Sequence, residues 1–343
     1  MQVRHNKNAS QSLITTLTGI PVPVRETFHN HTDKKMILSD QQQQLIENLI
    51  PIARIATDGS RVPLKQVILP RCSSLIVGPS GSGKTYLAKH IANMLDLPCL
   101  LINVSTWVLM ASRSEPWTWT TIVDWLASLK GGGIIILDEI DKLGGGNNGA
   151  GSEYSSFLRL EIFSLMDGSI PTGIKIQDLS GWSATAFPEA SQAVRLDLEN
   201  VLQCRVFTIG CGAWQLEWQS NSKTLGFTNE PEPAKAEPPT MEQILNSIQP
   251  ELRQRFRNKI SFLNPMTKPE YEAVAKAISN QIPASYHREW QAQIDEVIRV
   301  ACETNLGMRA FEELILSVMI MSETEHELPA RKSLEKKQML DLI

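Results

Sequence analysis

The chain has 343 residues, of which 42% are hydrophobic and 20% charged, and its formal net charge at pH 7 is −4. This composition predicts a globular protein with room for two domains, and it does not favour non-specific binding to nucleic acid. The five cysteines form no Cys-x-x-Cys pair, which argues against a disulfide scaffold or a zinc site. The start of the chain lacks the apolar core of a signal peptide, and no run has the length of a membrane span. We therefore expect a cytoplasmic protein without a membrane partner.

The first part of the chain is polar and weakly patterned. Residues 1–36 contain Pro21 and Pro23, and we expect them to form an N-terminal extension. Ser39 and the residue after it are suited to cap a helix, and apolar residues at helical spacing predict that helix over residues 41–56.

The sequence GPSGSGKT matches the P-loop pattern G-x-x-x-x-G-K-[ST] at every fixed position. An apolar run over 74–77 predicts a buried strand before it, and helical spacing follows over 86–95. In this context glycines let backbone N–H groups close around phosphate oxygens, whereas the alternative is a flexible Gly/Ser turn. Lys84 is expected to reach the β- and γ-phosphates of ATP, and the Thr85 hydroxyl is expected to hold Mg²⁺. We expect ATP to be bound by Gly78, Pro79, Ser80, Gly81, Ser82, Gly83, Lys84 and Thr85.

A further apolar run, over 133–137, ends in two carboxylates. This run predicts a strand, and with Asp138 and Glu139 it makes a Walker B signature. Asp138 would bind Mg²⁺ beside Thr85, and Glu139 would polarise the attacking water as a general base. Alone, such carboxylates equally suit a solvated turn. Their pairing with the upstream P-loop favours the catalytic interpretation.

Strands and helices alternate along the middle of the chain. Apolar runs over 98–104 and 206–210 predict further strands, and a helix is predicted over 153–167. This alternation predicts an α/β fold, in which a parallel sheet is flanked by helices. Residues 267–320 are helical in pattern and predict a smaller, all-helical second domain. The expected division is an N-terminal extension over 1–36, an α/β ATPase domain over 37–265, and a helical lid domain with a polar tail over 266–343.

The order of these motifs resembles an AAA+ ATPase, and within that superfamily it is most similar to ClpX-type unfoldases. The resemblance implies an arginine finger at Arg255, in PELRQRF, with Arg253 as the alternative. It also implies a nucleotide-sensing arginine at Arg309, in GMRAFEELI. A finger acts on the neighbouring subunit, so the resemblance implies a ring, by family analogy a hexamer. The stretches that carry it are GPSGSGKT, ILDEIDKL, LRLEIFSLMDGSI, VFTIGCGAW, PELRQRF and GMRAFEELI.

Two further stretches bear on what such a motor would act upon. Trp117 falls where ClpX-type rings carry a pore tyrosine, and Trp119 follows it; both also suit the core of a helix start. Trp182 is a weaker candidate for a second pore loop. The tripeptide Leu225-Gly226-Phe227 resembles the loop that docks ClpX on the ClpP peptidase, although a match of this length also arises by chance. The chain lacks that family's cysteine-paired zinc domain and its Gly-Tyr-Val-Gly pore sequence.

The leading hypothesis is therefore an ATP-hydrolysing, ring-forming motor that remodels or unfolds proteins and feeds a ClpP-like peptidase. The alternative is a regulatory AAA+ ATPase that assembles on DNA or controls a partner enzyme without threading. The basic cluster Arg253, Arg255, Arg257 and Lys259 motivates the DNA-bound alternative, while the negative net charge argues against it.

Overall fold

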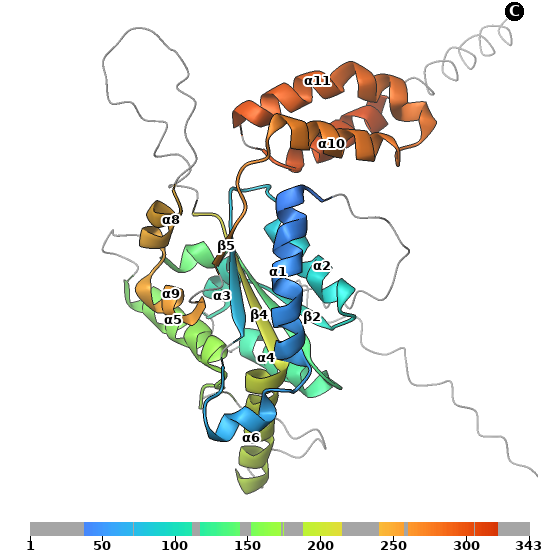
Figure 1. The fold of residues 1–343 in the computed structure, drawn as a ribbon. Coiled ribbons are helices and arrows are strands. Elements are labelled where there is room, and N and C mark those ends of the chain that lie inside the picture. Colours follow the sequence, from blue (N-terminus) through green and yellow to red (C-terminus); the bar gives the residue numbers. More distant parts are fainter. Residues whose placement is uncertain are drawn as a thin grey trace, which may run out of the picture.

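The structure is a computed structural model. It describes residues 38–70, 72–111, 117–144, 152–172, 174, 188–214, 240–256, 260–304 and 306–321. In these ranges an α/β part comes first and a smaller helical part follows it at one end (Figure 1). No helix among the described residues has the length and apolar character needed to cross a membrane.

The α/β part is built on one sheet of five parallel strands. The strand order is β2-β3-β4-β1-β5, so β1 lies between β4 and β5. Because parallel strands share a direction, their carboxyl ends meet at one edge of the sheet. The strands are β1 (Ser73–Val77), β2 (Cys99–Asn103), β3 (Gly133–Asp138), β4 (Val206–Gly212) and β5 (Ile260–Phe262).

Helices cover both faces of this sheet, which is why β1 and β4 are buried along their whole length. On one face α1 (Asp40–Thr57) and α2 (Lys84–Met94) pack in a shared apolar cluster. The opposite face carries a second cluster, to which the remaining helices of this part contribute (Figure 1). These helices are α3 (Val104–Ala111), α4 (Trp117–Ser128), α5 (Ser152–Asp167), α6 (Pro188–Arg205), α8 (Met241–Ser247) and α9 (Pro250–Phe256). Short 3-10 turns are η1 (Val62–Gln66) and η2 (Ile140–Gly144).

The helical part, which we call the lid, has an apolar core of its own. It contains α10 (Lys268–Ser279), η3 (Ala284–Tyr286), α11 (His287–Thr304) and a last helix over 309–321. Buried aromatic rings join these helices: Phe311 stacks on Trp290 at 6.4 Å between ring centroids and contacts Tyr271 at 5.9 Å. These contacts pack the three helices into one apolar cluster.

Candidate nucleotide-binding site

The P-loop connects the carboxyl end of β1 to the first turn of α2. Its backbone is fixed to the neighbouring strand, because the Gly78 N–H donates to the Gly212 carbonyl at 3.3 Å. Gly83 has φ +83°, a left-handed conformation that glycine adopts without strain, and it lies at the N-cap of α2. The loop therefore places a helix N-terminus at the edge of the sheet where phosphate would bind.

Lys84 is folded back onto the loop that carries it. Its Nζ donates to the carbonyls of Gly78 and Pro79, at 2.8 Å each, and the residue is only 9% exposed. Burial lowers the pKa of Lys84, and the nearby carboxylates of Asp138 and Asp141 oppose that shift. An ammonium group removed from water and held by neutral carbonyls is a favourable partner for a phosphate oxygen.

The loop also offers donors that have no acceptor. In the described part of the chain no hydrogen bond uses the backbone N–H of Gly83, Lys84 or Thr85. The hydroxyl of Ser82 is buried there without a partner as well. A buried donor without an acceptor, such as the Ser82 hydroxyl, is costly, and phosphate oxygens would accept from it and from these N–H groups. The residues present thus fit a nucleotide phosphate.

The two residues expected to hold Mg²⁺ are in contact. The Thr85 hydroxyl donates to Asp138 Oδ1 at 2.9 Å, and the Glu139 N–H donates to the same oxygen at 3.0 Å. Hydroxyl and carboxylate oxygens are the ligands that Mg²⁺ accepts, usually together with phosphate oxygens and water. No cluster of three or more His, Cys, Asp or Glu side chains suited to a metal occurs among the described residues. A metal held by Thr85 and Asp138 would take further ligands from the nucleotide phosphates and from water.

Glu139 has a strained backbone and a partner that the sequence analysis missed. Its φ is +57°, which is uncommon for a residue with a side chain and occurs at functional sites. Its carboxylate accepts a hydrogen bond from the Ser105 hydroxyl at 2.6 Å. Ser105 is brought there because β2 and β3 pair with Asn103 opposite Asp138. In the sequence, the one indication of this contact was that Ser105 directly follows the strand predicted over 98–104.

Arg309 is brought to this site from the lid. It is exposed and lies at the start of the helix over 309–321. Its positive charge is near enough to contribute to the lowered pKa of Lys84. The neighbouring residue Met308 contacts the P-loop, because its N–H donates to the Gly81 carbonyl at 3.0 Å. The nucleotide-sensing role of Arg309 stays a prediction.

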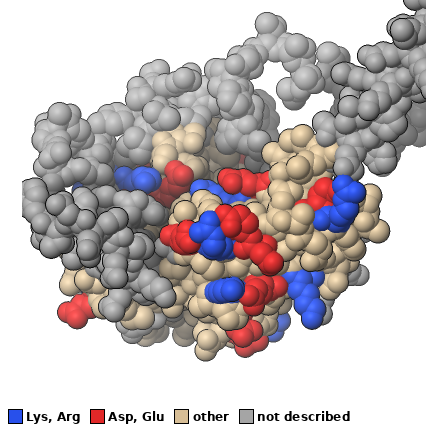
Figure 2. All heavy atoms as spheres, turned by 90° about the horizontal axis from the view of Figure 1, so that it is seen from above, with Lys and Arg blue, Asp and Glu red and all other residues tan. Residues whose placement is uncertain are grey.

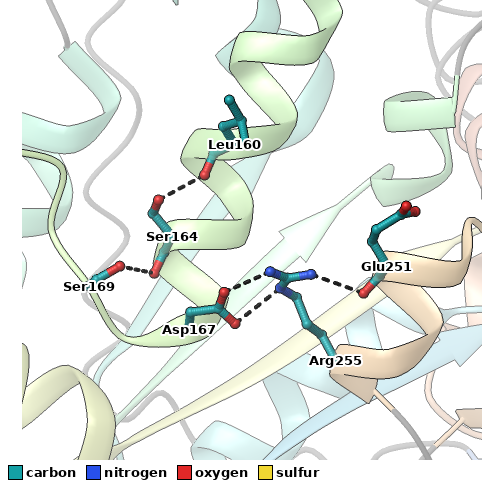
Figure 3. A network of polar contacts seen from close by, with 6 residues as sticks. All are labelled: Leu160, Ser164, Asp167, Ser169, Glu251 and Arg255. Carbon is teal, nitrogen blue, oxygen red and sulfur yellow. Dashed lines mark hydrogen bonds and ion pairs between the residues drawn. The ribbon is translucent and has the colours of Figure 1, made fainter.

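Arg255 lies elsewhere, between α9 and the end of α5 (Figure 3). Its Nε and Nη2 donate to the two carboxylate oxygens of Asp167 at 3.1 and 2.7 Å, and its Nη1 donates to the Glu251 carbonyl at 3.1 Å. The guanidinium also lies 4.2 Å from the ring centroid of Phe163. Among the described residues, the guanidinium of Arg253 donates one hydrogen bond, to the Leu245 carbonyl at 3.3 Å. Arg255 is thus held in one orientation within its own subunit, away from its own P-loop.

Of the residues predicted to contact a substrate or a peptidase, the structure describes the side chain of Trp119. Trp119 is 0% exposed and packs edge-to-face against Trp107, with 6.1 Å between ring centroids. The expectation that Trp119 faces a pore is therefore wrong in this structure, because the ring completes the core beneath α4. The backbone of Trp117 is helical, but its side chain lies outside the described residues, as do Trp182 and Leu225-Gly226-Phe227.

Comparisons with known proteins agree with this geometry. Residues 74–236 match the family model described as ATPase family associated with various cellular activities (AAA). A curated relative, ATP-dependent zinc metalloprotease FtsH 3 of Phytoplasma mali (strain AT), is 28% identical over 171 residues. That alignment covers 48% of this chain and 25% of the relative, so the chain spans about a quarter of that protein's length. Residues 74–236 include the P-loop, Asp138 and Glu139. Residues 74–236 therefore resemble an ATPase domain of the AAA type.

Proposed function

We propose that the chain is an ATP-driven motor that assembles into a ring and remodels protein substrates. The observation that carries the proposal is the convergence of Lys84, Thr85, Asp138 and Glu139 at one edge of the sheet, next to the lid turn that contacts Gly81. In this proposal the chain has three parts: an extension over 1–36, an ATPase domain over 37–265, and a lid over 266–343. The separate apolar core of the lid supports the second boundary.

Each residue has a distinct role in the proposed chemistry. Lys84 would leave its two carbonyl partners and bind the β- and γ-phosphates, since a phosphate offers it an opposite charge. Mg²⁺ held by Thr85 and Asp138 would neutralise charge on the phosphates. Glu139 would accept a proton from the attacking water, and the Ser105 hydroxyl would orient its carboxylate.

Arg255 would act on the ATP of the neighbouring subunit. The Asp167 carboxylate and the Glu251 carbonyl occupy three of its five N–H donors, which leaves one hydrogen on each of Nη1 and Nη2 for a phosphate. A guanidinium fixed in this way loses little side-chain entropy when it meets the phosphate. This role requires an oligomer, which we propose to be a ring and, by family analogy, a hexamer.

The finer resemblance to ClpX-type unfoldases belongs to this proposal too. The comparisons support the AAA family as a whole rather than that type in particular. We propose that Trp117 grips the polypeptide and that Leu225-Gly226-Phe227 docks on a ClpP-like peptidase. The motivating observations are the position of Trp117 as the first residue of α4 and the sequence of the tripeptide.

The structure gives less support to the alternative that the chain assembles on DNA. Arg255, the centre of the predicted basic cluster, is ion-paired with Asp167. On the lid side of the molecule, Lys and Arg side chains are interspersed with Asp and Glu rather than gathered into a basic patch (Figure 2). The pairs there include Arg299 with Glu296 and Glu303. A surface of mixed charge does not attract the phosphate backbone strongly.

ATP-dependent unfolding of a fluorescent reporter with an unstructured tail tests the motor directly. We expect the wild-type chain to unfold the reporter and Trp117→Ala to do so about tenfold more slowly, because truncating a central aromatic contact typically costs more than 1 kcal/mol. Trp117→Tyr, which keeps an aromatic ring, is the matched control and should retain unfolding. ATP turnover should stay within a few-fold in both variants. Absence of unfolding by the wild type would overturn the motor, and normal unfolding by Trp117→Ala would remove Trp117 from it.

A further inference from the structure

The lid touches the P-loop through its backbone. The Met308 N–H donates to the Gly81 carbonyl at 3.0 Å, and this bond joins the turn before the last lid helix to the middle of the loop. Gly81 has φ +81° and Gly307 has φ +62°, so both sides of the contact are in the left-handed region. Two segments far apart in the sequence thus meet without any side chain between them.

This contact requires glycine on both sides. A Cβ on Gly81 would overlap the carbonyl oxygen of Leu306, and a Cβ on Gly307 would overlap the carbonyl oxygen of Gly81. Both obstacles are backbone atoms, so no rotation of a side chain could relieve them. The left-handed φ values add a cost of about 1 kcal/mol or more for any other residue. Two requirements therefore explain glycine at positions 81 and 307: the left-handed backbone conformation and the close approach of the two backbones.

The turn that makes the contact is anchored to the lid core. The Gly307 N–H donates to the Tyr271 hydroxyl at 2.9 Å, and that hydroxyl donates to the Ala301 carbonyl at 3.4 Å. Tyr271 is only 1% exposed. Because its ring packs in the shared cluster of the lid helices, a rotation of the lid would carry the turn with it.

The same turn begins the helix that carries Arg309. The Ala310 N–H donates to the Gly307 carbonyl at 3.3 Å, and the Phe311 N–H donates to the Met308 carbonyl at 3.1 Å. The position of Gly307 therefore sets where this helix starts and where Arg309 stands relative to the loop. The influence of the Arg309 charge on the pKa of Lys84 is consistent with that placement.

The next residue of the P-loop is held from the other side. Gln42, 8% exposed in the first turn of α1, donates from Nε2 to the Ser82 carbonyl at 3.0 Å. Its Oε1 accepts the Ser39 N–H at 3.0 Å, which completes the capping box of α1. The lid thus holds the carbonyl of Gly81 while α1 holds that of Ser82. A movement of the lid would therefore change the backbone conformation of the P-loop between the Gly81 and Ser82 carbonyls.

We propose that Gly307 is a positioning residue, which forms a backbone latch with Gly81 and thereby sets Arg309 over the P-loop. This inference rests on the proposed ATPase role of Arg309 and extends it to the coupling between lid and loop. When phosphate binding shifts the P-loop, the latch passes that shift to the lid. When the lid rotates, the latch withdraws Arg309 and alters the loop at Gly81.

Gly307→Ala, compared with Gly59→Ala, tests the latch. Gly59 also has a left-handed φ, of +81°, but a Cβ there would meet only the Arg205 guanidinium, at 3.4 Å. We expect Gly307→Ala to lower ATP turnover about 10- to 100-fold, as expected for a displacement of roughly 1 Å at a reacting centre. Gly59→Ala should stay within a few-fold of the wild type. Hydrogen exchange of the Met308 amide, measured without nucleotide, should accelerate in Gly307→Ala and stay unchanged in Gly59→Ala.

A double variant separates positioning from general damage to the lid. If Gly307 acts through Arg309, Gly307→Ala combined with Arg309→Ala should turn over no more slowly than Arg309→Ala alone. Tyr271→Phe, which removes the acceptor of the Gly307 N–H, supplies a milder disruption should Gly307→Ala fold poorly. It should also accelerate exchange at Met308 and lower turnover.

Three results would overturn the latch: rapid exchange of Met308 in the wild type, equal behaviour of Gly307→Ala and Gly59→Ala, or multiplied losses in the double variant. Should Gly307→Ala not fold, unchanged exchange and turnover in Tyr271→Phe would overturn it instead. A wild-type chain that protects Met308 but hydrolyses no ATP would keep the contact and overturn the proposed function instead.

Discussion

Replacing Arg255 with alanine is expected to lower ATP turnover by about 10³-fold, the lower end of the range for an arginine finger. Binding of a fluorescent ATP analogue should change only a few-fold, because the P-loop of the same subunit is untouched. The large effect follows from the loss of a fixed positive charge at the developing charge of the transferred phosphoryl group. The side chain is already oriented by Asp167, so it needs little rearrangement to act.

Mixing subunits tests whether Arg255 acts on its neighbour. Arg255→Ala keeps an intact P-loop, and Lys84→Ala keeps an intact Arg255, so each variant alone should be nearly inactive. In mixed assemblies some sites combine the intact P-loop of one subunit with the intact Arg255 of the next, and turnover should partly recover. Arg253→Ala is the matched control and should retain most turnover. Absence of recovery would contradict action between subunits, and a larger loss in Arg253→Ala would move the role to Arg253.

The second large effect is expected for Glu139→Gln, which should lower turnover by about 10²- to 10⁴-fold, the range for general acid–base catalysis. The amide can still accept the hydrogen bond from Ser105, but it cannot take a proton from water. ATP should therefore bind and remain unhydrolysed, which pre-steady-state quench measurements would detect.

Glu161→Gln is a suitable control for Glu139. The Glu161 carboxylate also accepts one side-chain hydrogen bond, from Trp107 Nε1 at 3.0 Å, but it lies on α5. This variant should retain most of the wild-type turnover. Near-normal hydrolysis by Glu139→Gln would show that another group activates the water. Because Glu139→Gln should keep ATP bound and unhydrolysed, this variant should also retain the substrate that the assembly engages.

Much of the fold could be predicted because its signals are local. Continuous apolar runs bounded by Gly, Pro or Asp identified β1 and β3 to within a residue, and the helix expected over 41–56 is α1, Asp40–Thr57. The parallel α/β architecture is confirmed by the sheet and by the AAA family match. For α4 only a helix start at Trp117 and Trp119 was considered, as the alternative to a pore loop, and α6 was not predicted. In α4 aromatic and aliphatic residues occupy several faces, which blurs the helical period, whereas α6 is largely polar.

The contacts that complete the site depend on tertiary structure. Ser105 meets Glu139 only because β2 pairs with β3, and Gly307 meets Gly81 only because the lid stands over the P-loop. The burial of Trp119 likewise needs Trp107 from another helix. Residue spacing along the chain carries no information about such partners. It could indicate the phosphate-binding residues, whose motif is contiguous, but not the groups that orient them.

ATP turnover per chain, measured across a wide range of protein concentration, tests the central claim that a composite ATP site is shared between subunits. We expect turnover to require Mg²⁺ and to rise with concentration until light scattering shows assembly to be complete, because Arg255 must come from a neighbour. Constant turnover per chain, down to concentrations at which the protein is monomeric, would contradict the shared site. Absence of hydrolysis by the assembled protein would contradict the ATPase itself.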